Sequence, residues 1–123
     1  MVEFTTRCNA RGPERGSGTV LALGLVAVAV ALFAGILLLS QAAVMASKAA
    51  TAADLAALAA ADAARGLVAG EPCSVAEGVA ARNDARITSC QVLAGDEVQV
   101  ATEFSQPFAL GVATGRARAG PPP

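Results

Sequence analysis

The chain has 123 residues, a formal net charge of -1 at pH 7 and a mean hydropathy of +0.55. It contains no histidine, so it lacks the commonest metal ligand, and its near-neutral charge argues against nucleic acid as a partner. Much of the apolar content lies in one run, which leaves at most one small domain outside it. We therefore expect a structural protein rather than an enzyme, with no cofactor, no metal ion and no small-molecule substrate.

The most apolar part of the chain lies in its first half. Residues 16–47 carry no charge, and residues 19–39 are 21 consecutive apolar or small residues. The hydrocarbon core of a bilayer needs roughly 20 residues of helix, so this run is long enough to span it. We expect a transmembrane helix over residues 17–46. The alternative is a cleaved secretory signal peptide, because Val44 and Ala46 stand where a signal peptidase could accept them, although the apolar region of such a peptide is usually only about 7 to 15 residues long.

The basic residues around this run predict its orientation. Arg7, Arg11 and Arg15 precede it, whereas Lys48 is the basic residue that follows closely. Loops on the cytoplasmic side carry the excess of Lys and Arg. We therefore expect residues 1–16 to form a cytoplasmic leader of a single-pass cell-membrane protein, with the lipid bilayer as a partner and the C-terminal part outside the cytoplasm.

Small residues recur every fourth position within the run, at Ala27, Ala31 and Gly35. In lipid, small side chains let two helix backbones approach closely, and this packing drives helix association. The spacing therefore predicts a helix-packing ridge. The alternative is that an alanine-rich span produces such spacings by chance.

The helix is expected to continue beyond the bilayer, because residues 41–65 contain no proline or glycine and alanine has the best helix propensity. We assign residues 47–70 to this alanine-rich extension, which Gly66, Gly70 and Pro72 then terminate. At about 100° per residue, one side of it carries larger or polar residues and the other carries alanine. The larger or polar side consists of Ser47, Thr51, Asp54, Leu58, Asp62 and Arg65, and the alanine side of Ala49, Ala53, Ala56, Ala60 and Ala64.

The alanine side raises the question of what covers it. An alanine buries little area, so we expect the helix to gain little by packing against its own domain. Small side chains do allow close packing against neighbouring helices, which favours an assembly role. A solvated alanine spacer is the simpler alternative.

Residues 71–120 predict a small α+β head. Residues 73–85 read as a short helix, with Ser74 and Glu77 at the spacing of a capping box. The complete fold class expected is thus a membrane-anchored α+β protein, with one long N-terminal helix followed by this head.

Two strands are predicted after the short helix, over residues 87–93 and 97–104. The second alternates apolar and polar residues, and the "AGD" between the strands favours a hairpin. Residues 108–120 can add a third strand, and residues 121–123 should form a loose tail.

The cysteines bear on the stability of so small a head. Cys90 shares one face of its strand with Thr88 and Val92, and we expect this face to point inward. Outside the cell, a disulfide from Cys73 to Cys90 would stabilise the head by roughly 3 kcal/mol. Two separate buried thiols are the alternative, whereas a metal site lacks ligands. Cys8, in the leader, should stay reduced.

The pieces "ERGSGTVLALGL" (residues 14–25) and "AADLAALAAADAARG" (residues 52–66) resemble the TadE/TadG-like family of tight-adherence (Flp) pilus assembly proteins. The likeness is greatest to a short TadE-like subgroup encoded near helicase and secretion genes. The family's alanine-rich motif corresponds here to Ala52, Ala53, Asp54, Leu55, Ala56, Ala57 and Leu58. Further matching pieces are "EPC" (71–73), Cys90, "EVQVATEF" (97–104) and "ARAGP" (117–121).

This resemblance implies a pilin-like fold and a minor pseudopilin or accessory protein of a Flp-type pilus or secretion apparatus. Its partners would be other pilin-like or assembly proteins, bound through the long helix. The family also implies a processing site between Gly16 and Ser17. The chain departs from the pilin pattern at Leu21, where pilins carry glutamate.

Overall fold

The computed structural model describes residues 15–107 and 109–123. Predictions about the leader residues Arg7, Cys8 and Arg11, and about Phe108, lie outside the described residues. The chain divides into two compact units, Met1–Leu37 and Leu38–Pro123, and the boundary falls within the long helix α2.

Helix α2 spans Arg15–Ala64 and contains 50 residues. Its composition explains its length, because its sequence contains no proline and is dominated by alanine and leucine. Gly66 ends it as predicted, with a backbone φ of 75°. The N–H of Gly66 donates to the carbonyl of Ala63 and that of Leu67 to the carbonyl of Asp62, which is the Schellman pattern.

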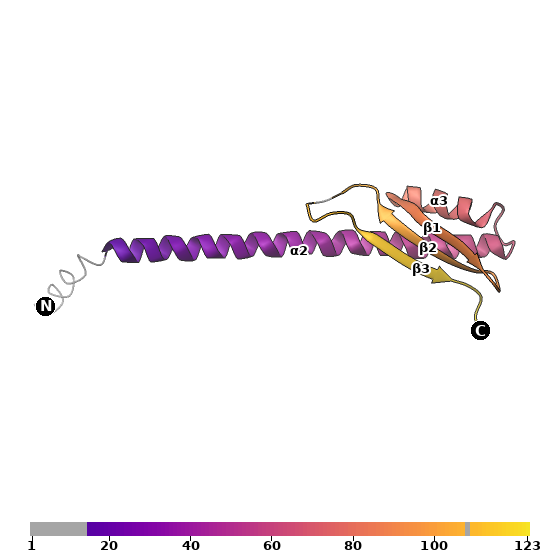
Figure 1. Ribbon diagram of the computed structural model, residues 1–123, viewed down its shortest axis with the longest axis horizontal. Coiled ribbons are helices and arrows are strands. Elements are labelled where there is room, and N and C mark those ends of the chain that lie inside the picture. Colours follow the sequence, from indigo (N-terminus) through magenta and orange to yellow (C-terminus); the bar gives the residue numbers. More distant parts are fainter. Residues whose placement is uncertain (1–14, 108) are drawn as a thin grey trace, which may run out of the picture. The chain divides into compact units, whose positions relative to one another are not determined.

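The second unit contains a three-stranded antiparallel sheet in the order β1-β2-β3. The strands are β1 (Ala85–Leu93), β2 (Glu97–Phe104) and β3 (Thr114–Ala119). Helix α3 (Pro72–Arg82) and the last turns of α2 lie against this sheet (Figure 1). The predicted α+β class, the short helix, the hairpin and the third strand are therefore confirmed.

The alanine side of α2 forms the core of this unit, and the expectation that it would gain little by packing against its own domain is wrong. Val98 and Val100 of β2 are 0 % exposed and share one buried cluster with alanines of both helices. The area per alanine is small, but the helix backbone comes so close to the sheet that many alanines are buried together. The alanines of this cluster are Ala52, Ala56, Ala57, Ala60, Ala61, Ala76, Ala80 and Ala85.

Contacts of main-chain atoms show how closely α2 approaches the strands. The hydroxyl of Thr102, which is buried, donates to the carbonyl oxygen of Ala49 over 2.8 Å. A Cβ added to Gly115 of β3 would lie 2.7 Å from the backbone nitrogen of Ala50. Helix and sheet can therefore meet here only because Gly115 has no side chain.

Helix α2 and strand β2 run in opposite directions. Val98 and Val100 pack at the level of Ala52–Ala61, whereas Phe104 and Ala113 cluster with Ala49 and Met45. Later residues of β2 therefore lie beside earlier residues of α2. The end of β2 and the start of β3 lie beside the earliest turns of α2 in this unit.

One detail of β1 differs from the prediction. A bulge between Ile87 and Ser89 interrupts its pairing with β2. Ile87, which pairs with Thr102, and Cys90, which pairs with Val100, pack against the core, whereas Thr88 is exposed. The extra residue shifts the alternation by one, so Thr88 does not share the inward face.

Candidate membrane segment and disulfide-tied head

The apolar run presents its large side chains outward. Every large apolar residue from Val20 to Leu39 is at least 40 % exposed, and none of its most apolar window is buried. By length and composition, one helix of the described chain, Gly16–Ala64, can cross a membrane. An N-terminal signal sequence would have the same length and composition.

The predicted packing ridge lies in the first unit. Ala27 and Ala31 are exposed and Gly35 is half-buried, and four-residue steps place them on one side of α2. A Cβ at Gly35 would meet nothing within 4 Å. No described residue covers this side, but a role in helix packing stays a prediction.

The predicted processing site lies at the N-terminal end of the apolar run. Gly16 and Ser17 are in the first turns of α2, and both are exposed. Cleavage between them also remains a prediction.

The alanine-rich motif divides its residues between two sides of α2. Ala52, Ala53, Ala56 and Ala57 are all completely buried, whereas Asp54, Leu55 and Leu58 are exposed. The sequence pattern therefore serves the internal core with its alanines. Its two leucines form an outward apolar pair, Leu55 and Leu58, on the opposite side of the helix.

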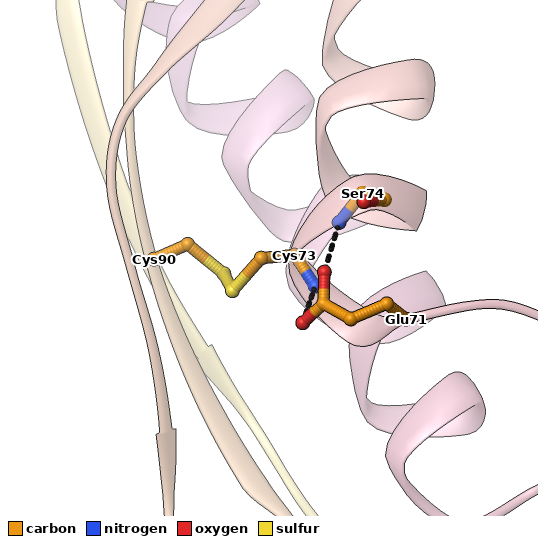
Figure 2. Close-up of a disulfide and its surroundings, with 4 residues drawn as sticks. All are labelled: Glu71, Cys73, Ser74 and Cys90. Carbon is orange, nitrogen blue, oxygen red and sulfur yellow. Dashed lines mark hydrogen bonds between the residues drawn. A yellow bond between two sulfur atoms is a disulfide. The ribbon is translucent and has the colours of Figure 1, made fainter.

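The disulfide between Cys73 and Cys90 is confirmed. It joins the first turn of α3 to the middle of β1, with 5.9 Å between the two Cα atoms (Figure 2). Cys90 also pairs with Val100 of the buried cluster. The bond thus fastens α3 to the edge strand at the level of the core.

The cap of α3 differs from the predicted capping box. Glu71 is the N-cap, and its carboxylate accepts hydrogen bonds from the N–H of Ser74 at 2.9 Å and of Cys73 at 3.2 Å (Figure 2). Pro72 occupies the first turn, where its missing N–H costs nothing, so the helix starts before Ser74. The two hydrogen bonds, that from Ser74 first, lower the pKa of Glu71, although the side chain is solvent-exposed.

This cap predicts a dependence of stability on pH. A carboxylate whose pKa is lower in the folded state stabilises the fold above its unfolded pKa and loses that effect as the pH falls through the folded pKa. Glu71→Gln should therefore be less stable than the wild type at pH 7, and the difference should vanish in acid. Urea unfolding followed by pulse proteolysis, at pH 7 and at acidic pH, measures this difference in the free energy of unfolding. Glu77→Gln, six residues further along the chain in α3, is the control, and an equal response of both variants would contradict the assignment.

The outer face of the sheet is polar. Arg86 pairs with Glu103 at 3.1 Å, and Arg118 pairs with Glu97. These exposed pairs connect neighbouring strands and contribute little to stability. They leave this face hydrated, in contrast to the alanine-packed inner face.

A polar hollow of about 300 Å³ lies where α2, the end of α3 and the end of β2 meet. It combines two basic side chains with one carboxylate, two hydroxyls, an amide and an aromatic ring. Its lining consists of Ser47, Lys48, Thr51, Arg82, Asn83, Asp84 and Phe104. Across residues 15–107 and 109–123, no group of three or more His, Cys, Asp or Glu side chains could hold a metal ion.

The described residues therefore form an exposed apolar helix and a head that a disulfide cross-links. Sequence reasoning missed Glu71 and Gly115 as structural residues; the Glu-Pro pair before Cys73 is the signal that could have indicated the cap. Comparison of this chain with family models, curated proteins and solved structures finds no match.

Proposed function

We propose that this chain is a single-pass membrane protein whose head lies outside the cytoplasm and whose role is structural. The observation that carries the proposal is the continuity of α2, in which an outward-facing apolar run is followed by the alanines of the head's core. An apolar surface of this length is costly in water and stable in lipid.

Two independent features support the orientation. The arginines at positions 7, 11 and 15 precede the apolar run, and the side with more basic residues stays in the cytoplasm. The Cys73–Cys90 disulfide supports a position of the head outside the cytoplasm, because disulfides persist in the oxidising compartments there.

The assembly role that we propose is that of a TadE-like minor pseudopilin or accessory component of a Flp-type pilus or secretion apparatus. The ridge at Ala27, Ala31 and Gly35 supports it, because no described residue covers it. The outward apolar pair, Leu55 and Leu58, supports contact with a second helix above the membrane. The partners would be other pilin-like or assembly proteins.

The anchor is tested by the position of the mature N-terminus and by topology. Membranes from cells that produce the full chain are washed with alkaline carbonate, and the retained protein is sequenced from its N-terminus. An intact start or a start at Ser17 supports the anchor, and Ser17 also supports leader processing. A start near Ser47 with release into the medium would contradict it, as would protection of the C-terminal part from protease added outside the cell.

The ridge predicts the effect of a bulkier residue. Ala31→Ile should weaken association between the full-length chain and its helical partners, because the added side chain prevents close backbone approach. Ala29→Ile is the matched control, since position 29 lies about 160° away around the helix. Cross-linking in native membranes measures the association. Equal yields for both variants would contradict the ridge.

A further inference from the structure

The β2–β3 loop, of which the structure describes residues 105–107 and 109–112, lies at the end of the head beside the earliest turns of α2 in this unit. It follows Phe104 and precedes Ala113, both of which cluster with Met45 of α2. Leu38 and Leu39, the last residues of the apolar run, belong to the same compact unit and are exposed. The loop therefore emerges on the side of the head where the apolar run ends.

The loop is long enough to reach that level. Met45 lies six residues after Leu39, which is about 9 Å along a helix axis at about 1.5 Å per residue. An eight-residue loop that goes out and returns can extend by about four residues, or about 13 Å at roughly 3.3 Å per residue. The loop can therefore reach the height of Leu39.

The composition of the loop suits an apolar environment. Residues 105–112 contain no charged residue. Leu110 is 58 % exposed and Val112 is 42 % exposed, so the loop turns these side chains away from the core. No described residue covers the exposed surface of these two side chains.

Basic side chains flank the same end. Lys48 and Arg82 line the polar hollow together with Phe104, and neither pairs with a carboxylate among the described residues. Asp84 also lines the hollow, so the formal net charge of the side chains around the hollow is +1. Lys48 is the first charged residue after the apolar run, and long basic side chains extend toward phosphate groups while their stems cover apolar surface.

We propose that the β2–β3 loop lies in the interfacial layer of the bilayer, with Leu110 and Val112 among the upper acyl chains and Lys48 and Arg82 facing the lipid phosphates. The head would then rest on the membrane through a second contact besides its helix. This inference rests on the proposed membrane anchor. It commits to lipid as the occupant because the loop adjoins the apolar run and basic groups border it.

Depth-dependent fluorescence quenching tests the contact. The full chain with Cys8→Ser and Leu110→Cys is labelled with an environment-sensitive fluorophore and reconstituted into vesicles that contain anionic lipid. Leu67→Cys is the matched control, because Leu67 is 65 % exposed but follows the far end of α2. We expect a blue-shifted emission at position 110, quenched by nitroxides placed at a shallow depth in the acyl chains. We expect aqueous emission at position 67.

The outcomes separate this inference from the anchor. A chain that stays in carbonate-washed vesicles while its label at position 110 behaves like that at position 67 overturns the lipid contact alone. Emission at position 110 that shifts only on addition of a protein partner also overturns it. A chain that is washed out of the vesicles overturns both the contact and the anchor.

Discussion

Replacing Cys73 and Cys90 together with serine should lower the free energy of unfolding of the second unit by about 3 kcal/mol, as expected for a bridge that closes a loop of this size. The two residues are 17 positions apart, and the bond ties α3 to β1. Without it, α3 is held only by its packing against β1 and the alanine core. Urea unfolding of the full chain in detergent, followed by pulse proteolysis, measures the change.

The matched control for this prediction is Cys8→Ser, which removes the remaining cysteine and should leave the urea midpoint unchanged. Reduction of the wild type should reproduce the loss seen in the double variant. If the oxidised wild type and the double variant unfolded at the same urea concentration, the bond would have no stabilising role.

The second large effect is expected at Gly115. Gly115→Ala should destabilise the second unit by about 1–3 kcal/mol, the usual range for overpacking. The new Cβ would collide with the carbonyl of Ala49 and lie 2.7 Å from the nitrogen of Ala50. Both are main-chain atoms, so no side-chain rotation relieves the collision, and β3 must move away from α2. The midpoint of urea unfolding measures this loss.

Gly78→Ala provides a control with the opposite sign. Gly78 lies within α3, and a Cβ there would meet nothing within 4 Å. Alanine is favoured over glycine inside a helix, so this variant should gain about 0.5–1 kcal/mol. If Gly115→Ala and Gly78→Ala changed the midpoint of urea unfolding equally, the close approach of β3 to Ala49 would leave room for a Cβ at position 115.

Local patterns in the sequence were sufficient for most elements. Apolar length predicted the first part of α2, alternation predicted β2, and Gly66 predicted the end of the helix. The pairing of Cys73 with Cys90 followed from the need of a small domain for a cross-link. The inferences about α2 and β2 depend on near neighbours in the chain, and the one about the disulfide depends on the size of the domain.

The failures concern contacts between distant residues. The alanine side of α2 looked too small to form a core, because nothing local to Ala49 indicates that Gly115 would leave room for it. The cap was assigned to Ser74 because its spacing to Glu77 is a known signal, yet the preceding Glu-Pro pair starts the helix earlier. The bulge near Thr88 has no local signal at all, and it decides which side chains of β1 face inward.

The contact between Gly115 and α2 also has a consequence for the order in which the protein matures. The turns around Ala49 are synthesised long before the β3 strand exists. Until residues 114–119 have been made, the carbonyl of Ala49 and the neighbouring alanines have no covering strand. If the head lies outside the cytoplasm, as we propose, the helix reaches the membrane with its inner side bare, and a chaperone or a sister helix has only a limited time in which to bind there.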